Sequence, residues 1–215
     1  MRPKGLTFRL YLITDRKLAG ASGILAVCEA ALQGAPRGTV AIQLREKDLE
    51  ARELFELACQ MRQLCDRYGA PLMVNDRIDV AIAARADGVH LASRSIRAAD
   101  ARKLLGNNVL IGVSTHSPAD VIDAAGQGAD FVVFGPVFAP LSKSSYGTPQ
   151  GRDGLRAACH VAPIPVFALG GITAERIESI ADCDAAGVGV IGSVMGADDP
   201  KGAVESLIEA IARWK

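Results

Sequence analysis

The sequence predicts an α/β fold, a single-domain (β/α)8 barrel of the TIM-barrel type that spans residues 1–215. Three observations predict it: eight short apolar segments recur along the chain, a helix-like stretch follows each of them, and polar or glycine residues gather where each apolar segment ends. Parallel strands covered by helices have this pattern, because such strands are buried on both faces. In these barrels the functional residues lie at the carboxyl ends of the strands.

The apolar segments are rich in Val, Ile, Leu and Phe and do not alternate regularly with polar residues, as expected for strands between two apolar layers. The predicted strands span residues 9–14, 39–45, 71–75, 88–91, 109–114, 131–135, 165–171 and 188–193. The predicted helices span residues 22–34, 49–68, 77–86, 96–105, 117–127, 151–161, 173–182 and 200–213. A doubly wound sheet is the alternative architecture, and the regular repetition of eight units favours the barrel.

The composition of the chain excludes several classes of binding partner and cellular location. The 215 residues include 24 Lys and Arg and 24 Asp and Glu, and this balance argues against nucleic acid or a membrane surface as the main partner. The apolar run near the amino terminus is too short for a signal peptide, and no run has transmembrane length. The five cysteines include no C-x-x-C pair, which argues against a metal or redox role. We therefore expect a cytoplasmic protein, and a homodimer stays an open alternative.

Two glycine-containing turns follow the seventh and eighth predicted strands. Gly170 and Gly171 follow the seventh, and Gly192 and Ser193 follow the eighth. Glycine lets the backbone approach a ligand closely, and the free N–H groups at the start of a helix bind anions. Barrels of this type often hold a phosphate with these two loops, so we predict a phosphorylated small-molecule substrate. Tight turns without a ligand are the alternative explanation.

The second predicted strand ends in a run of polar and basic residues. Gln43 and Arg45 share one face of this strand, because side chains alternate along it, and Lys47 follows on the loop. A guanidinium can bind a phosphate through two parallel hydrogen bonds, which predicts a phosphate or diphosphate site here. The alternative is that Arg45 forms a salt bridge to a carboxylate on a neighbouring strand.

Asn75 and Asp76 end the third predicted strand. A carboxylate at this position suits Mg²⁺, which binds to carboxylates together with substrate phosphates. Asp76 could equally cap the third helix, since aspartate is a favoured residue at the start of a helix. Both interpretations stay open at the level of the sequence.

His116 follows the fifth predicted strand, close to Ser114, and His90 ends the fourth. Histidine titrates near neutral pH and is a common proton shuttle. We favour His116 for a catalytic role, and we expect His90 to point into the barrel as a hydrogen-bonded core residue. The longest irregular segment, 138–151, includes Ser142 and Lys143 and is either a lid over the site or a plain surface connection.

Taken together, these segments resemble the thiamine phosphate synthase family, which includes a thiazole tautomerase branch of the TenI type. The resemblance spans residues 9–195 and rests on motifs that occur in one order: LYLITD, QLREK, NDRIDVA, ADGVHL, IGVSTHS, GADFVVFGPVF and IPVFALGGIT. It implies a β/α barrel that acts on thiazole phosphate compounds in thiamine biosynthesis. In the synthase reaction, diphosphate leaves hydroxymethylpyrimidine diphosphate and the thiazole nitrogen takes its place.

The resemblance also implies roles for individual residues. Asp76 matches one of two aspartates that bind magnesium in the synthases. The residues that match substrate- and phosphate-binding positions are Gln43, Arg45, Lys47, Asn75, Ser114, Ser142, Lys143, Gly170, Gly171, Ile191, Gly192 and Ser193.

The chain departs from the synthase pattern at the second magnesium aspartate. The synthases typically have H-x-G-Q-x-D after the fourth strand, where this chain has His90-Leu91-Ala92-Ser93-Arg94-Ser95. The loop motif Thr-x-Thr-Lys is also reduced, to Pro140-Leu141-Ser142-Lys143. Both departures favour the tautomerase branch, which moves a proton and needs no metal cofactor.

Three functions therefore remain under consideration. In the first, a thiazole tautomerase, His116 shuttles the proton, and Arg45 and Lys47 complete the catalytic set. The second is thiamine phosphate synthase with Mg²⁺ as its cofactor. The third is a non-catalytic regulatory barrel that binds a phosphorylated ligand, since a fold alone does not fix a function.

Overall fold

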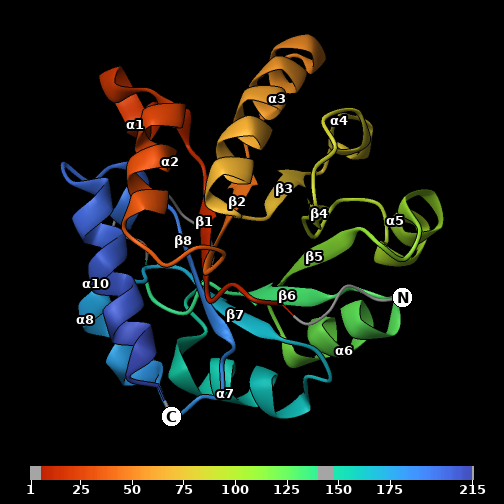
Figure 1. The fold of residues 1–215 in the computed structure, drawn as a ribbon. Helices are drawn as coiled ribbons and strands as arrows, with labels where there is room; N and C mark the ends of the chain where they lie inside the picture. Colours follow the sequence, from red (N-terminus) through yellow and green to blue (C-terminus); the bar gives the residue numbers. More distant parts are fainter. Residues whose placement is uncertain (1–5, 140–147, 215) are drawn as a thin grey trace.

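The computed structural model describes residues 6–139 and 148–214, and its eight parallel strands close into a barrel (Figure 1). The strands pair in chain order, and β1 pairs with β8 to close the ring. The strands are β1 Leu10–Ile13, β2 Val40–Leu44, β3 Leu72–Asn75, β4 Gly88–Leu91, β5 Leu110–Thr115, β6 Phe131–Phe134, β7 Val166–Leu169 and β8 Gly187–Val190. The predicted barrel is thus confirmed, and each strand lies in its predicted segment or within a residue of it.

Helices surround the barrel (Figure 1). They are α1 Arg16–Ala19, α2 Ile24–Gln33, α3 Ala51–Tyr68, α4 Ile78–Ala83, α5 Ala98–Leu105, α6 Pro118–Gly126, α7 Gly151–Val161, α8 Ala174–Ile177, α9 Gly192–Met195 and α10 Pro200–Ala212. The sequence did not predict α1 and α9, because four residues are too few to show a helical repeat of apolar positions. The predicted helix 173–182 divides into α8 and the 3-10 turn Glu178–Ile180.

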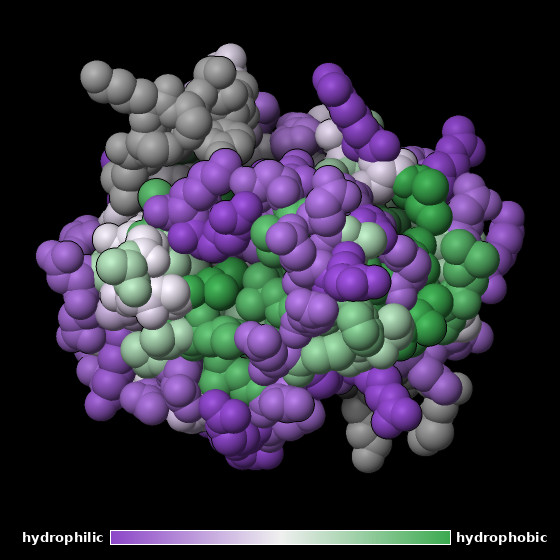
Figure 2. Space-filling view, turned by 90° about the horizontal axis from the view of Figure 1, so that it is seen from above, coloured by the Kyte–Doolittle hydropathy of each residue, from purple (hydrophilic) through white to green (hydrophobic). Residues whose placement is uncertain are grey.

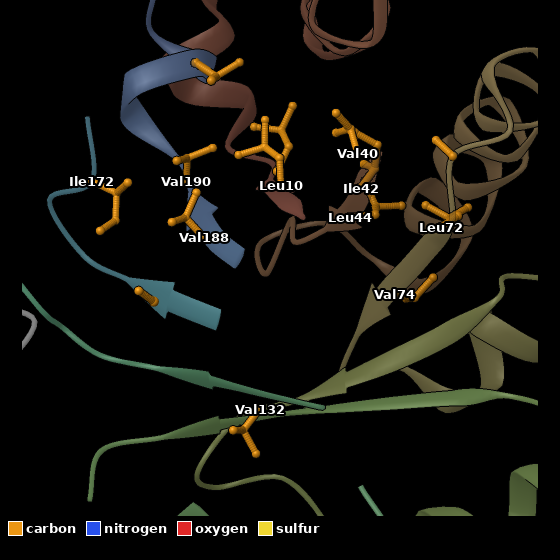
Figure 3. Packing of buried hydrophobic residues seen from close by; sticks show 14 of the residues in the cluster. Leu10, Val40, Ile42, Leu44, Leu72, Val74, Val132, Ile172, Val188 and Val190 are labelled. Atoms are coloured by element: carbon orange, nitrogen blue, oxygen red, sulfur yellow. The ribbon is translucent and has the colours of Figure 1, made fainter. Parts of the chain in front are cut away.

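The strands separate two apolar layers, because successive side chains point to opposite faces. The inner cluster fills the barrel and consists of Phe8, Tyr11, Ile13, Ala41, Met73, Phe131, Val133 and Phe167. The outer cluster lies between the strands and the helices, and Figure 3 shows Leu10, Ile42 and Leu72 of three neighbouring strands in it. Both faces of each strand are therefore apolar, which explains why the sequence shows no regular alternation.

Two ion pairs fasten the amino-terminal end of the barrel. Asp130, just before β6, accepts hydrogen bonds from the backbone N–H of Ile111 at 2.8 Å and from the Arg102 guanidinium at 2.6 Å. Asp87, just before β4, likewise accepts from the backbone N–H of Leu72 and from Arg62. Each aspartate thus joins a helix to two strands at the end of the barrel that lies opposite the carboxyl ends.

Figure 2 shows a surface on which hydrophilic residues cover much of the visible face, with smaller apolar areas between them. Such a mixture is ordinary for a folded protein, whose surface keeps many apolar atoms. Within residues 6–139 and 148–214, none of the helices combines the length and the apolarity that crossing a lipid bilayer requires.

Candidate active site

We call the carboxyl ends of the strands, together with the loops that follow them, the rim. Four polar residues occupy inward-facing positions there. Gln43 follows the inner-cluster residue Ala41 by two positions, so its side chain points into the barrel as well. Asn75, His90 and Ser114 also point inward on β3, β4 and β5. Asn75 is paired with His90, whereas Ser114 lies two residues beyond Gly112, the residue paired with His90. At the rim, the side chains that point into the barrel are therefore polar, whereas those of the inner cluster below are apolar.

One chain of hydrogen bonds runs across β2, β3 and the loop after β4. The Gln43 amide donates to Asn75 Oδ1 at 2.9 Å, and the Asn75 amide donates to Asp76 Oδ2 at 3.2 Å. The Ser95 hydroxyl donates to the other oxygen of Asp76. Gln43 Oε1 is buried and has no hydrogen-bond partner among the described residues. Because a buried acceptor without a partner is unfavourable, this oxygen is suited to a donor group of a ligand.

A second chain lies deeper in the barrel. The Tyr11 hydroxyl lies 3.3 Å from His90 Nδ1, and Ser114 Oγ lies 2.9 Å from His90 Nε2. Burial lowers the pKa of His90 from 6.5 to about 3, and it raises the pKa of Tyr11. Both side chains are therefore neutral near pH 7, and His90 is the hydrogen-bonded core histidine that the sequence predicted.

Arg45 lies just beyond β2 and is half-buried. Its backbone N–H donates to Thr14 Oγ1 at 2.9 Å, and the Thr14 hydroxyl donates to the buried carboxylate of Glu46 at 2.6 Å. These contacts fix the backbone that carries Arg45 and the exposed Lys47. Neither cation forms a salt bridge within the part of the chain that the structure describes, so the salt-bridge alternative for Arg45 is wrong there.

Asp76 does not cap the helix that follows it. Helix α4 begins at Ile78, the residue at its amino-terminal cap is Arg77, and the exposed Asp76 has a φ angle of 59°. Aspartate tolerates this left-handed conformation better than most residues. The capping alternative is therefore wrong, and the carboxylate is left at the rim with Asn75 and Ser95.

His116 lies on the exposed turn between β5 and α6. Its Nδ1 donates to the carbonyl oxygen of Gly135 at 2.5 Å. A carbonyl oxygen only accepts, so Nδ1 carries a hydrogen, and Nε2 has no hydrogen-bond partner among the residues that the structure describes. A depression of about 450 Å³ next to the rim is lined by His116, Ser114 and Ser95 among other residues.

The two glycine turns lie side by side, because β7 pairs with β8. Gly170 and Gly171 have φ angles of 102° and 60°, which favour glycine. A Cβ at Gly170 would lie 2.7 Å from Pro136 Cα, so the turn packs tightly against the segment after β6. Ile191 precedes α9, which begins at Gly192 and Ser193.

Arg176 on α8 holds the first of these turns in place. It donates to the carbonyl oxygen of Gly171 at 2.8 Å, and its guanidinium lies over the Phe138 ring, 5.4 Å from the ring centre. The predicted phosphate-binding residues Ser142 and Lys143 lie outside the described residues, as does most of the 138–151 segment.

Sequence reasoning missed the residues that support the rim from below or behind: Tyr11, Thr14, Glu46 and Arg176. The first three lie in or next to apolar strands, within the motifs LYLITD and QLREK, but the residue pattern of these motifs does not show their contacts. Their role follows only from the register of β1 with β2 and from the closure of the barrel.

A family model described as "Thiamine monophosphate synthase" matches residues 10–194. The chain belongs to the thiamine monophosphate synthase family. A thiamine-phosphate synthase of Chloroflexus aurantiacus is 40% identical over 200 residues, which cover 93% of this chain and 91% of that protein. A protein of Geobacter sulfurreducens, described as "Putative thiamine-phosphate synthase", is 51% identical over 201 residues. The match covers 94% of this chain and 93% of that protein.

A solved structure of thiamine phosphate pyrophosphorylase from Pyrococcus furiosus superposes with a TM-score of 0.86 at 34% identity, and the match covers 96% of each chain. Membership of the thiamine monophosphate synthase family makes this chain a transferase of thiamine biosynthesis. These names favour the synthase over the tautomerase that the sequence departures favoured.

Proposed function

We propose that this member of the thiamine monophosphate synthase family joins hydroxymethylpyrimidine diphosphate to thiazole phosphate and releases diphosphate. The observation that carries the proposal is the composition of the rim. The Arg45 guanidinium lacks an ion pair within the described residues, while the Asp76 carboxylate and the Ser114 hydroxyl lie at the ends of nearby strands. Arg45 directly follows β2 and Asp76 directly follows β3, and these two strands are paired, so the cation and the carboxylate lie at neighbouring strand ends.

The role of these residues follows from where charge develops. As the carbon–oxygen bond to the diphosphate breaks, negative charge builds on the leaving group. Arg45 binds this group through its forked N–H donors, Lys47 adds a second cation, and Ser114 adds a hydroxyl donor. Thr14 and Glu46 hold the backbone from which the Arg45 side chain extends, so the base of this side chain is fixed before the substrate arrives.

The donor set at Asp76 fits a magnesium ion that is shared with the substrate. The set consists of one exposed carboxylate and the Ser95 hydroxyl, and no cluster of three or more His, Cys, Asp or Glu side chains could hold a metal ion anywhere in the described ranges. Mg²⁺ binds readily through one or two carboxylates plus substrate phosphates. The chemistry that bound Mg²⁺ would supply is neutralisation of the charge on the diphosphate.

The thiazole phosphate is assigned to the two glycine turns. Gly170 and Gly171 bring the backbone to the rim without side chains, and Gly192 and Ser193 add the start of α9 beside them. The neighbouring β7 and β8 thus present both turns to one phosphate, at the position where such barrels bind phosphate.

The experiment that tests the proposal is an assay with purified protein, both substrates and Mg²⁺. Formation of thiamine phosphate that depends on all three components is expected. Arg45→Ala should lower kcat/KM by about 100-fold, since it removes a charged partner of the leaving group. No thiamine phosphate, together with rapid tautomerisation of a thiazole carboxylate phosphate, would overturn it.

One observation keeps the tautomerase as the second candidate. The Nδ1–H of His116 is held by Gly135, so Nε2 is available as a general base at the edge of the depression beside Ser114. The same assay mixture, with a thiazole carboxylate phosphate in place of the two synthase substrates, tests this activity directly. Binding of phosphates without turnover of any substrate would instead support the regulatory barrel.

A further inference from the structure

The buried pair of Tyr11 and His90 lies beneath the rim and reaches it through the hydrogen bond between His90 and Ser114. Tyr11 is completely buried, and His90 is 2% exposed. Three phenylalanine rings of the inner cluster pack around Tyr11: Phe8 is stacked on it, Phe131 is edge-on to it and Phe167 is tilted. A tyrosine hydroxyl and an imidazole in such an apolar interior are unfavourable unless they are hydrogen-bonded, and here each is a hydrogen-bond partner of the other.

The hydroxyl of Tyr11 decides which nitrogen of His90 carries the hydrogen. His90 Nδ1, at 3.3 Å, is the partner of this hydroxyl among the described residues. If Nδ1 carried a hydrogen, it would donate to Tyr11, and the hydrogen of the buried hydroxyl would have no acceptor. The hydroxyl therefore donates to an unprotonated Nδ1, and the hydrogen of the neutral ring lies on Nε2.

The consequence reaches Ser114 at the rim. A hydrogen on Nε2 is donated to Ser114 Oγ across 2.9 Å, so the serine oxygen accepts from below. The hydroxyl hydrogen of Ser114 then takes no part in the hydrogen bond to His90 and can be donated to another acceptor. In the opposite tautomer Ser114 would donate to Nε2, and its hydrogen would be turned away from the rim.

We propose that Tyr11 and His90 are positioning residues, which hold His90 as the Nε2–H tautomer so that Ser114 presents its hydroxyl hydrogen to an anionic phosphate oxygen of the substrate. The effect on the substrate rests on the proposed function, whereas the tautomer itself is a property of the free protein. Tyr11 is completely buried in the inner cluster, so it acts on the substrate only through His90 and Ser114.

The tautomer is measured on the ligand-free protein by two-bond ¹⁵N–¹H correlation spectra of ¹⁵N-histidine-labelled protein. The chain has three histidines, and the variants His116→Asn and His160→Asn assign their two signals, which leaves His90. A single Nε2–H tautomer at His90 near pH 7 is expected. An Nδ1–H tautomer at His90 in the wild-type protein overturns the proposal, whatever the activity of the enzyme.

Tyr11→Phe removes the hydroxyl and keeps the packed ring. A growing share of the Nδ1–H tautomer is expected, together with a loss of about 5- to 10-fold in kcat/KM for the diphosphate substrate, the size of one hydrogen bond. The KM for thiazole phosphate should stay unchanged. Tyr68→Phe is the matched control, since it removes a hydroxyl that contacts Gln33 and Glu29 on the surface.

A double-mutant cycle separates positioning from general loss of structure. If Tyr11 acts through the Ser114 hydroxyl, Tyr11→Phe lowers kcat/KM in the wild-type background but has no further effect in the Ser114→Ala background. Equal losses in both backgrounds would overturn the link to Ser114. Failure to form thiamine phosphate in any background would contradict the proposed function and leave the spectra of His90 as an independent test.

Discussion

The Ser95 hydroxyl donates a hydrogen bond to Oδ1 of Asp76 and thereby joins the loop after β4 to the end of β3. Ser95 occupies the position at which the synthase pattern has a second acid. Asp76 is therefore the one carboxylate of this donor set among the described residues, and the remaining ligands of a magnesium ion have to come from the substrate and water.

Ser95→Asp should strengthen magnesium binding. A second carboxylate raises the charge of the donor set, so we expect the apparent affinity for Mg²⁺ in the presence of inorganic diphosphate to rise about 10-fold. Without the metal, the two carboxylates repel each other and the variant should unfold at a lower temperature than the wild type. Thermal unfolding across a magnesium titration measures both effects. Ser93→Asp adds the same charge without the contact to Asp76, and equal responses of the two variants would contradict the prediction.

His116→Asn should separate the two candidate reactions. An asparagine N–H can keep the hydrogen bond to Gly135, but it cannot act as a base. For a synthase we expect kcat/KM to stay within about 5-fold of the wild type, whereas loss of a general base would cost a tautomerase about 10²–10⁴-fold. His160→Asn, on the exposed surface of α7, is the control. A loss of synthase activity above about 100-fold would contradict this prediction and show that His116 takes part in the synthase reaction rather than only stabilising the turn.

The sequence predicted the barrel well because each strand is an apolar segment with a helix after it. Ser117 and Pro118 show how local signals set a boundary: the serine side chain accepts from the backbone N–H of Asp120, and proline occupies the first turn of α6. Helix α3 begins two residues after its predicted start, because Glu50 is its amino-terminal cap and forms a capping box with Glu53.

The candidate site was predictable only in part. Gln43, Asn75 and Ser114 could be placed at the rim because they stand at the carboxyl ends of predicted strands. The two alternatives that failed, a cap at Asp76 and a salt bridge at Arg45, depend on backbone conformation and on contacts between distant segments. The role of Tyr11 could not be predicted from the sequence either, because it depends on a contact with the distant residue His90. Among apolar residues, a tyrosine is otherwise indistinguishable from an ordinary core residue.

Asp130→Asn should destabilise the protein without changing catalysis. The substitution removes the charge that pairs with the partly buried Arg102, so we expect the free energy of unfolding to fall by about 2 kcal/mol. Asp100→Asn breaks an exposed pair with Lys103 and should change it by less than about 0.5 kcal/mol. Urea unfolding measures the difference. Because Asp130 lies at the amino-terminal end of the barrel, a change in kcat of the folded variant would contradict this separation of stability from function.

His90 should make the stability of the protein depend on pH in a defined window. Burial lowers its pKa in the folded state from 6.5 to about 3, so the unfolded chain binds a proton between these values and the folded protein does not. The contribution of this histidine is therefore fully present above pH 6.5 and is lost as the pH falls towards 3, by up to about 1.4 kcal/mol per pH unit.

Urea unfolding of the wild type and of His90→Asn at a series of pH values isolates this contribution. The difference in free energy of unfolding between the two proteins should shrink as the pH falls below 6.5, because only the wild type takes up the extra proton on unfolding. His160→Asn, which removes an exposed histidine, should follow the wild-type curve. Parallel curves for the wild type and His90→Asn would mean that His90 becomes charged inside the folded barrel, and the neutral ring on which the orientation of Ser114 depends would then be lost.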